Sequence, residues 1–492
     1  MTTDAAASVI VQIGRGPTGT ALARQLLPAL PAGTRYIVLD RDPVAPHLAF
    51  GTEEPTHLLN TRAAKSSLNL ADPDELSRWL TENAEGATDS VPEFPARALF
   101  GRYVRDMFDV AVKQAAEARV QVDVRQEEAV RVAADGGRWR VSCGSGRSFD
   151  ADQVVICPGM LTQSEPYPEL TGHPGYFTDP WRLPALPADA GVAVIGTRLT
   201  AIDTFLALTA RGHRGPVRLV SRSGRLPRLR GPETTAPVPN VERCMRAAAD
   251  AGVLRLADFG RALMADIEAA SATPPDWSEV RDCGPTTRDM LAAELAEVAA
   301  GGERGWQQVV NGASPMLLPA WQLLAEADRT EFFAEWLTPL LVHGAPIPVD
   351  TARRVLAGMD AGLLSVDGGL REVRWAADVF EVVTEAARYE ADVVINATGA
   401  GTDVAALRAE PLLADMLDEG LLTPHPHGGV RIDVSTFAPL DAAGIPVRGI
   451  HVVGDLARGA VLVTNDVIAL SFQAVLVATA MRANSEAGVH IS

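Results

Sequence analysis

The sequence predicts an α/β fold with parallel sheets, because a pattern of apolar strand, glycine turn, helix and second strand occurs twice. The first copy covers residues 8–40 and the second covers residues 192–222. The first glycine and the charged residue that ends the pattern are 26 residues apart in both copies, Gly14 to Asp40 and Gly196 to Arg222. A repeated strand–helix–strand unit of this kind is typical of Rossmann-like domains, in which helices cover both faces of the sheet.

The first copy has the glycine spacing G-x-G-x-x-G at Gly14, Gly16 and Gly19, directly after the β-branched run at residues 9–13. In such a turn the first glycine makes the bend, the second lets a pyrophosphate approach the backbone, and the third lets the helix pack on the strand. The helix N-terminus then directs N–H groups and a positive dipole end at the phosphates. Asp40 follows the second strand, where a carboxylate accepts hydrogen bonds from an adenosine ribose. The pattern predicts a dinucleotide site, and a glycine turn without a ligand is the alternative.

Composition narrows the classes of function. A net charge of −18 and a pI near 5.0 disfavour nucleic acid and an anionic membrane as partners. The N-terminus lacks the features of a signal peptide, and no uninterrupted apolar run reaches the ~18 residues of a membrane helix. The four cysteines form no C-x-x-C pair, which argues against a zinc ribbon or a dithiol site. We expect a cytoplasmic protein without a metal, with a homo-oligomer as one option for its assembly.

Further apolar patterns predict the other elements. Residues 83–100 are typical of a loop, residues 160–190 of a proline-rich linker and residues 240–345 of a mostly helical region, whose tryptophans suit core positions better than cofactor contacts. Three short strands within residues 120–142 favour a small antiparallel set. The expected helices are 20–30, 103–118, 200–211 and 465–481, and the expected strands are 9–13, 36–39, 120–124, 129–133, 139–142, 154–156, 192–195, 217–222, 371–375, 379–384, 392–396 and 449–453.

The second copy of the pattern differs from the first at two positions. It ends in Arg222 where the first ends in Asp40, and an arginine there suits the 2′-phosphate of NADP(H) better than NAD(H); a solvated surface arginine is the alternative. Arg198 occupies the middle glycine position, where a β-carbon takes up the space of a pyrophosphate. Either its guanidinium holds a phosphate bidentately, or nicotinamide binding is lost or displaced. The predicted contacts to NADP are Gly196, Thr197, Arg198, Thr200, Ser221 and Arg222.

The motifs together resemble those of a known family. They are Ile13–Gly19, Gly51 with His57–Asn60, Tyr176–Trp181, Val194–Asp203, Ser221–Gly224, Ala397–Gly399 and Gly454–Asp455. With these motifs, nearly the whole chain resembles flavoproteins with two dinucleotide-binding domains, and more closely a bacterial family of FAD/NAD(P)-binding proteins distantly related to class B flavin monooxygenases. The family usually has Gly-Thr-Gly-Leu-Thr-Ala in the second copy, and Arg198 replaces the middle glycine here. The resemblance is specific for the fold and for FAD, and much less specific for a substrate.

The resemblance implies that the first copy binds the adenosine diphosphate part of FAD and that Gly454 and Asp455 meet its other end. A helix opening near Thr464 and Asn465 would direct its positive end at the flavin N1–C2 edge, which becomes negative on reduction. A plain turn is the alternative at Gly454. The implied contacts to FAD are Gly14, Gly16, Pro17, Thr18, Gly19, Asp40, Arg41, Asn60, Gly159, Gly399, Gly454, Asp455, Thr464 and Asn465.

The resemblance also implies the order of the domains, with the second dinucleotide-binding domain inserted into the first. Residues 1–180 and 366–485 would form the two parts of the FAD-binding domain. Residues 181–235 would form an NADP-binding-like βαβ unit, and residues 236–365 a mostly helical insertion that shapes the substrate region.

The activity that the resemblance implies is that of an FAD-dependent monooxygenase reduced by NADPH. Through a flavin C4a-hydroperoxide, it would insert one oxygen atom of O₂ into a small-molecule substrate, at an amine, another heteroatom or an activated carbon. The candidate catalytic residues are His57, Asn60 and Lys65, in the segment expected beside the flavin ring; a packed histidine and a surface lysine are the alternatives. An NADPH-independent flavin oxidase or dehydrogenase with a degenerate nicotinamide site, and a non-enzymatic FAD-binding protein, remain as competing hypotheses. The pair His425 and His427 does not indicate a metal site, because no partner ligands accompany it.

Overall fold

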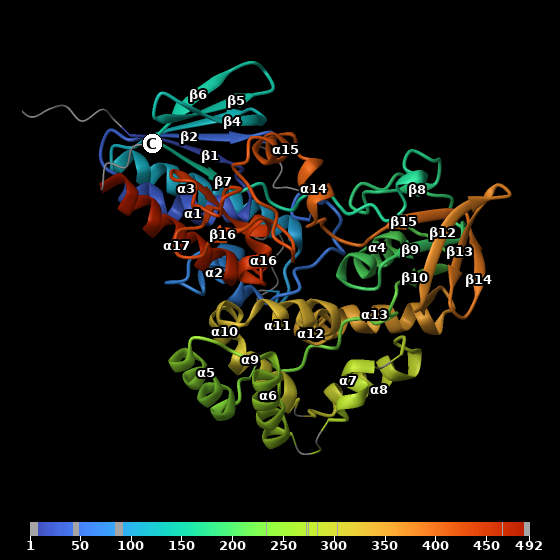
Figure 1. The fold of residues 1–492 in the computed structure, drawn as a ribbon. Helices are drawn as coiled ribbons and strands as arrows, with labels where there is room; N and C mark the ends of the chain where they lie inside the picture. Colours follow the sequence, from blue (N-terminus) through green and yellow to red (C-terminus); the bar gives the residue numbers. More distant parts are fainter. Residues whose placement is uncertain are drawn as a thin grey trace, which may run out of the picture. The chain divides into compact units, whose positions relative to one another are not determined.

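The chain forms two compact units, shown in the computed structural model of Figure 1. Unit 1 consists of Met1–Ser164 together with Ala400–Ser492, and unit 2 is the intervening segment Glu165–Gly399. The second Rossmann-like domain is therefore inserted into the first, as the sequence predicts. The structure describes residues 8–42, 49–83, 92–232, 234–271, 273, 275–282, 284–302, 304–464 and 466–486.

Unit 1 is built on a five-stranded sheet in which all the paired strands are parallel, in the order β18-β7-β1-β2-β3. The central strand β1 is buried along its whole length, as expected for a parallel sheet covered on both faces. Both strands next to β1 are almost equally buried, which is why they read as continuous apolar runs. The strands are β1 Val9–Ile13, β2 Arg35–Asp40, β3 Gln121–Gln126, β7 Gln153–Ile156 and β18 Ile450–Val452.

The helices of unit 1 pack around this sheet, and α1 contacts both α3 and α17. The helix α17 contains the stretch Val467–Asn484, which by length and composition alone is apolar enough to cross a membrane. Its residues Ala474, Val477 and Met481 are fully buried against the rest of unit 1, which is typical of a core helix. The helices are α1 Pro17–Leu26, α2 Glu75–Asn83, α3 Arg97–Glu117, α14 Val404–Arg408, α15 Pro411–Asp418, α16 Arg458–Val461 and α17 Val467–Glu486, with 3₁₀ turns at Leu27–Ala29, Ala63–Lys65 and Gly454–Ala457.

Unit 2 repeats the architecture of unit 1. Its five-stranded parallel sheet has the order β11-β10-β9-β15-β8, and the helix α4 follows β9 as α1 follows β1. In both units the strand that carries the glycine turn therefore lies at the centre of the sheet. The elements are β8 Tyr176–Phe177, β9 Val192–Ile195, α4 Leu199–Ala210, β10 Val217–Val220, β11 Leu364–Asp367 and β15 Val393–Asn396, with a 3₁₀ turn at Pro168–Leu170.

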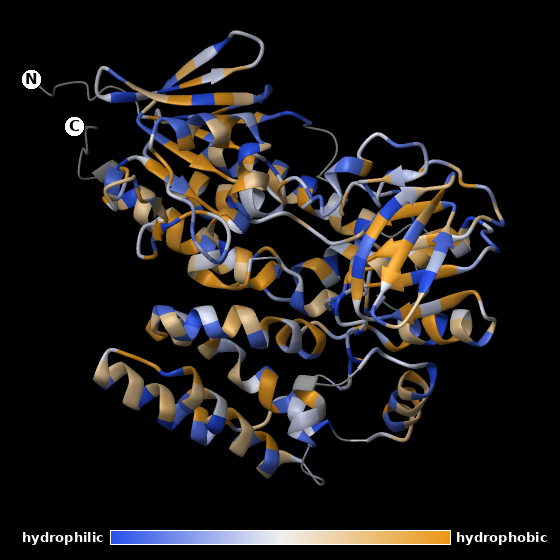
Figure 2. Cartoon of the chain, turned by 45° about the vertical axis from the view of Figure 1, so that its right-hand side comes forward, coloured by the Kyte–Doolittle hydropathy of each residue, from blue (hydrophilic) through white to orange (hydrophobic). Residues whose placement is uncertain are grey.

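Each unit also carries a three-stranded antiparallel sheet that directly precedes, in the chain, one strand of its parallel sheet: β7 in unit 1 and β15 in unit 2. Hydrophobic and hydrophilic residues alternate along these strands in Figure 2, and β13 alternates between half-buried and buried positions. Such alternation is typical of a sheet with one packed face and one wet face. The strands are β4 Ala129–Asp135, β5 Arg138–Cys143 and β6 Ser148–Ala151 in unit 1, β12 Leu370–Ala376, β13 Val379–Thr384 and β14 Arg388–Ala391 in unit 2, and a short pair, β16 Ile432–Asp433 with β17 Ala438–Pro439, in unit 1.

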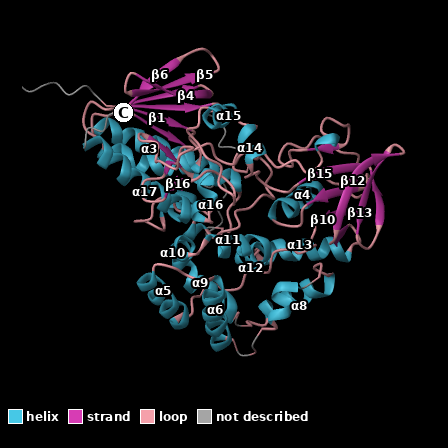
Figure 3. Cartoon of the chain, viewed as in Figure 1, coloured by secondary structure: helices cyan, strands magenta, loops and turns pink. Residues whose placement is uncertain are grey.

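The helical region of unit 2 follows β10 and is drawn as helices joined by loops in Figure 3. Trp321 is fully buried there and meets Phe332 and Phe333 edge-on, which confirms a core position for this tryptophan. The helices are α5 Pro239–Ala251, α6 Leu256–Ala270, α7 Trp277–Asp282, α8 Arg288–Ala299, α9 Gly305–Ala313, α10 Leu317–Leu323, α11 Glu326–Glu331, α12 Leu337–Gly344 and α13 Val349–Asp360, with a π-helical turn at Phe332–Trp336 and a 3₁₀ turn at Ser314–Met316.

Two expectations from the sequence are wrong in detail. The strand expected at residues 120–124 in an antiparallel set is β3, which pairs in parallel with β2; only β4, β5 and β6 form the antiparallel set. The reason is that α3 returns the chain across the sheet, so the next strand joins it in parallel. That helix also begins at Arg97, inside the loop expected at residues 83–100.

The boundaries between the units also differ from the expected ones. Residues 165–180 and 366–399 belong to unit 2 rather than to the FAD-binding domain. The physical reason is strand pairing, because β8 and β15 complete the sheet around β9. The three-stranded sheet of unit 2 immediately precedes β15 in the chain and lies in the same unit.

Candidate functional site

Two of the three glycines in the turn between β1 and α1 lie too close to other backbone atoms to carry a side chain. Gly14 has a φ of +95° and donates its N–H to the carbonyl oxygen of Leu39 at 2.8 Å. A β-carbon on Gly14 would lie 2.0 Å from the carbonyl oxygen of Cys157, and one on Gly19 would lie 2.3 Å from the carbonyl oxygen of Gly14. A side chain at either position would therefore disrupt the turn itself.

Gly16 is different, because a β-carbon placed on it would meet no atom of the described residues within 4 Å, its chain neighbours aside. Gly16 is the N-cap residue of α1, it is followed by Pro17, and it offers the helix no capping side chain. The fold of this unit alone therefore gives no reason for a glycine here. An open glycine backbone at a helix N-terminus fits the close approach of a pyrophosphate, whose charge the helix dipole attracts.

The carboxylate of Asp40 is fixed at the end of β2 by two backbone N–H groups. Arg15 donates to Oδ2 at 2.7 Å, and Asp42 donates to Oδ1 at 2.9 Å. Asp40 is only 5% exposed, yet it lines a pocket of about 70 Å³. Each carboxylate oxygen has two acceptor sites, so a carboxylate at this pocket can accept more than one hydrogen bond per oxygen.

The same pocket is bordered by a charged rim. Arg41 lies on this rim with its Nη1 atom 3.3 Å from Oε2 of Glu410 and 3.9 Å from Oε1 of Glu128. Glu410 is the N-cap residue of α15 and also accepts a hydrogen bond from Thr162 at 2.7 Å. Arg41 therefore pairs with two carboxylates that also line the pocket, next to Asp40, at which the sequence predicts a ribose.

Gly454, which is distant from the first glycine turn in sequence, lies beside the helix that follows this turn. Its φ is +78°, and a β-carbon on Gly454 would lie 3.4 Å from Oγ1 of Thr18 in the first turn of α1. The N–H of Gly454 donates to Oε1 of Gln473 on α17 at 3.0 Å. The structure thus brings together Thr18 and Gly454, two predicted FAD contacts that are distant in sequence.

Asp455 follows and is buried. Its Oδ1 accepts a hydrogen bond from the Thr464 hydroxyl at 2.5 Å, and Nη2 of Arg458 lies 3.4 Å from the same atom. Thr464 and Asp455, both predicted to contact FAD, are therefore joined by a hydrogen bond. The hydroxyl fixes the orientation of the carboxylate.

The helix α17 begins at Val467, later than the sequence predicts. The carboxylate of Asp466 accepts the N–H groups of Ile468 at 2.9 Å and of Ala469 at 3.1 Å. The helix start predicted near Thr464 is therefore too early, because Asp466 supplies the carboxylate that caps the helix. This carboxylate also places a negative charge at the helix N-terminus. Asn465 lies outside the described residues.

The segment with the three candidate catalytic residues has mixed burial. His57 is buried, and its Nδ1 lies 2.8 Å from the hydroxyl of Thr52, whereas Asn60 is half-buried. Lys65 is exposed at the end of the 3₁₀ turn Ala63–Lys65. His57 is therefore held inside unit 1, and Asn60 and Lys65 are the members of the group with accessible side chains.

The glycine turn of unit 2 is organised by hydroxyl groups. Gly196 has a φ of +131°, and a β-carbon on it would lie 2.6 Å from the carbonyl oxygen of Ala397. The Thr197 hydroxyl lies 3.0 Å from the Ser221 hydroxyl, which accepts the N–H of Gly224 at 2.9 Å. These contacts join the turn after β9 to the loop after β10, where a dinucleotide phosphate would be recognised.

Both predicted arginine contacts of unit 2 are exposed. Arg198 is the N-cap residue of α4, with an extended backbone at φ −101° and ψ −163°. Its position corresponds to that of the open Gly16 in unit 1. Arg222 directly follows Ser221 and is exposed at the end of the second strand, while Thr200 lies half-buried in the first turn of α4. The side chains expected to meet phosphate groups are thus accessible.

Gly159 and Gly399 follow β7 and β15, in equivalent places of the two units. Their φ values are +77° and +91°, which favour glycine.

His425 packs in a loop of unit 1. A β-carbon on Gly459 would lie 2.0 Å from the Nδ1 atom of His425, and the same Nδ1 atom accepts the N–H of His427 at 3.1 Å.

Sequence reasoning missed the polar support beneath the first turn. Gln12 is fully buried within β1, donates from Nε2 to the carbonyl oxygen of Gly14 at 2.8 Å and accepts the hydroxyl of Tyr36 at 2.5 Å. Burial raises the pKa of Tyr36 well above its usual value, so this hydroxyl remains a donor. A glutamine inside a β-branched run was the available signal. Gln473, which holds Gly454, gave no such signal.

Comparisons with known proteins agree with this architecture. Residues 11–161 match the family model described as FAD-NAD(P)-binding. No curated protein sequence matches the chain significantly. Among solved structures, the chain is similar to the ornithine hydroxylase PvdA of Pseudomonas aeruginosa, with 13% identity over 97% of this chain and 100% of that chain and a TM-score of 0.53.

Two further solved structures have the same fold. One is the ornithine N-hydroxylase KtzI of Kutzneria sp. 744 with reduced FAD, NADP⁺ and L-ornithine, with 14% identity over 97% of this chain and 100% of that chain and a TM-score of 0.52. The other is DfoA of Erwinia amylovora bound to FAD, a cadaverine monooxygenase, with 13% identity over 98% of this chain and 94% of that chain and a TM-score of 0.51. This chain therefore has the fold of flavoproteins with two dinucleotide-binding domains.

Proposed function

We propose that this chain, whose residues 11–161 match the FAD-NAD(P)-binding family, is an FAD-dependent monooxygenase that NADPH reduces. The observation that carries the proposal is the open backbone at Gly16, which a dinucleotide fits and which the fold of unit 1 does not need. Asp40 contacts this turn at the N–H of Arg15, and Gly454 lies next to Thr18 in the first turn of α1. Together they provide contacts for both halves of an extended FAD molecule.

The residues of unit 1 suit the parts of FAD in order. The carboxylate of Asp40 would accept the adenosine ribose hydroxyls, while Gly16 and the α1 N-terminus would bind the pyrophosphate. Asp455, oriented by Thr464, would accept hydrogen bonds from the ribityl hydroxyls. Bound FAD would supply the redox chemistry, taking a hydride from NADPH and passing the electrons to O₂, of which one oxygen atom enters the substrate.

The other task of the protein would be to position polar side chains beside the flavin and to exclude water from the site. Asn60 would donate a hydrogen bond to the flavin or to NADP, and Lys65 would stabilise negative charge that develops on oxygen. His57 is held by Thr52 inside unit 1, so its position favours a packing role for the segment. No acid–base triad is required by this reaction, because the main demand on the site is a dry, fixed geometry.

Unit 2 would bind NADPH at its glycine turn. Ser221 and Arg222 follow β10, where a hydroxyl and a guanidinium suit a 2′-phosphate. Arg198 stands at the middle glycine position with an exposed side chain, and its guanidinium would bind a phosphate in place of bare backbone. If Arg198 acts in this way, replacing it with alanine raises the KM for NADPH and for NADH alike, whereas a lowered KM would show that it obstructs the site.

We propose a small molecule as the substrate, with an amine, another heteroatom or an activated carbon as the oxidised group. The named functions of the similar structures, ornithine hydroxylases and a cadaverine monooxygenase, favour a primary amine. The second candidate function is a flavin oxidase that takes hydride from its substrate directly, and Arg198 favours it, because the arginine replaces the expected glycine in the nicotinamide unit.

One titration separates the candidates. NADPH is added anaerobically to the FAD-loaded protein while the flavin absorbance near ~450 nm is followed. Rapid bleaching by NADPH supports the monooxygenase, and detection of a hydroxylated amine in air with added diamines completes the assignment. Bleaching by an amine but not by NADPH supports the oxidase. A flavin that neither reagent bleaches leaves a non-enzymatic FAD-binding protein.

A further inference from the structure

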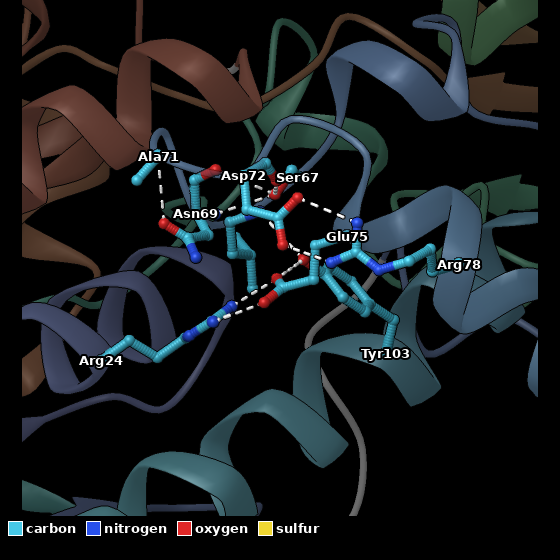
Figure 4. A network of polar contacts seen from close by, with 9 residues as sticks. Arg24, Ser67, Asn69, Ala71, Asp72, Glu75, Arg78 and Tyr103 are labelled. Atoms are coloured by element: carbon cyan, nitrogen blue, oxygen red, sulfur yellow. Dashed lines mark hydrogen bonds and ion pairs between the residues drawn. The ribbon is translucent and has the colours of Figure 1, made fainter.

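A buried polar network joins three helices of unit 1 to the segment that carries the candidate catalytic residues (Figure 4). Nη1 and Nη2 of Arg24 on α1 donate to the two carboxylate oxygens of Glu75 on α2, at 2.5 and 2.6 Å. The hydroxyl of Tyr103 on α3 donates to the same carboxylate at 2.5 Å. The backbone N–H of Leu68 donates to that hydroxyl at 3.0 Å. One tyrosine oxygen thus links the charge pair to the end of the segment.

The network is buried enough to be rigid. The side chains of Arg24 and Glu75 are 12% and 15% exposed, and Tyr103 and Leu68 are fully buried. A bidentate arginine–carboxylate pair fixes both partners in one plane. Burial, followed by the hydrogen bond to Glu75, raises the pKa of Tyr103, so its hydroxyl remains protonated and can donate to Glu75 while it accepts from Leu68.

The helix α3 holds the same segment at its other end. The N–H of Arg97 donates to the carbonyl oxygen of His57 at 2.8 Å, and its side-chain Nε donates to the carbonyl oxygen of Leu58 at 2.9 Å. Between these anchors, the hydroxyl of Ser66 donates to the carbonyl oxygen of Arg62 at 2.9 Å and closes the turn. Residues 57–68, here called the catalytic segment, are therefore fixed to α3 at both ends.

We infer that Tyr103 and Glu75 are positioning residues, which hold the catalytic segment so that Asn60 and Lys65 keep a fixed place beside the bound flavin. The inference rests on the proposed function, because it assigns a purpose to the rigidity of this segment. Arg24 neutralises the buried carboxylate and ties the network to α1, whose N-terminus would bind the FAD pyrophosphate. A segment that is free to move would admit water to the reduced flavin, and the electrons would then be lost to O₂ as hydrogen peroxide.

The test is the substitution Tyr103→Phe, which removes the hydroxyl and keeps the ring. The matched control is Tyr389→Phe in unit 2, where the tyrosine is half-buried and its hydroxyl lacks a hydrogen-bond partner among the described residues. Glu75→Gln serves as a second variant, because it keeps an acceptor for Tyr103 but removes the charge. Three quantities are measured: hydrogen exchange of residues 57–68, FAD content, and hydrogen peroxide released per bound flavin with NADPH in air.

The expected result for Tyr103→Phe is exchange of the catalytic segment about tenfold faster, as the loss of one buried hydrogen bond implies. Exchange in the C-terminal half of α3 and the FAD content remain as in the wild type, and peroxide release per flavin rises about threefold or more. Glu75→Gln, which leaves the buried Arg24 guanidinium without its charged partner, raises peroxide release per flavin at least as much. A purely structural role would change exchange throughout unit 1 and leave peroxide release per flavin unchanged.

Two results would overturn the inference, and a third would overturn its premise. Exchange of the catalytic segment at the wild-type rate, or peroxide release equal to that of Tyr389→Phe, shows that Tyr103 does not position the segment. A wild-type flavin that NADPH does not bleach instead refutes the proposed function, and with it the role of Tyr103 in that reaction. The wild-type titration therefore distinguishes the two failures.

Discussion

Replacing Asp40 with alanine tests the proposed FAD site at the side chain whose contacts are best defined. In the structure, the Asp40 carboxylate holds the N–H groups of Arg15 and Asp42 at 2.7 and 2.9 Å. Hydrogen bonds to a charged group contribute roughly 1.5–3 kcal/mol each. In the complex, the same carboxylate would accept one or two ribose hydroxyls, so its loss costs about 3 kcal/mol of FAD binding. That free energy corresponds to a Kd raised about 100-fold.

The assay is a titration of the apoprotein with FAD, followed by the quenching of flavin fluorescence. The matched control is Asp123→Asn on the neighbouring strand β3, where the carboxylate pairs with Arg125 at the surface and does not line the pocket. We expect the control to bind FAD as the wild type does. A Kd for Asp40→Ala within threefold of the wild-type value would refute the assignment of this carboxylate to the ribose.

Further outcomes are expected at other residues. Gly16→Ala should keep the melting temperature of the apoprotein within about 2 °C of the wild-type value but weaken FAD binding about tenfold or more. Gly19→Ala should lower the melting temperature of the apoprotein, because its β-carbon would lie 2.3 Å from a carbonyl oxygen. Equal melting temperatures for the two variants would contradict this reasoning. Arg222→Ala should raise the KM for NADPH about tenfold and leave that for NADH unchanged, with the surface variant Arg214→Ala as control; equal effects on both nucleotides would exclude a 2′-phosphate contact. Burial lowers the pKa of His451 to about 4, so the unfolded chain binds more protons below pH 6.5 and stability falls as the pH drops from 6.5 towards 4. At pH 5, His451 should cost about 2 kcal/mol in a urea unfolding experiment, a cost that His451→Asn removes.

The sequence is sufficient to predict the elements whose signals are local. The turn at Gly14, the helix after it and the strand that ends at Asp40 follow one another within a short stretch, and each step has its own residue pattern. The copy in unit 2 is found for the same reason. The insertion of one domain into the other is instead what the family resemblance implies, and the division of the chain into two units agrees with it.

Features that depend on distant contacts could not be predicted in this way. The strand β3 lies at the edge of the sheet with mostly exposed residues, so its pattern resembles a surface hairpin strand, and only the tertiary pairing with β2 reveals its place. The contact of Gly454 with Thr18 and the bond from Leu68 to Tyr103 likewise join residues far apart in the chain. Tyr103 looks like any aromatic residue on an amphipathic helix, and nothing in its neighbourhood indicates a partner.

The division of unit 1 into two chain segments has a consequence for biosynthesis. When the ribosome has released residue 399, the whole of unit 2 is available, whereas the sheet of unit 1 still lacks its edge strand β18. Domains generally fold as units as the chain emerges. The inserted unit can thus fold first, and the contact of Gly454 with Thr18 forms only after a segment that is translated later than unit 2. A nascent chain cut short before Gly454 would contain all of unit 2 but would lack Gly454 and Asp455 of the proposed FAD site.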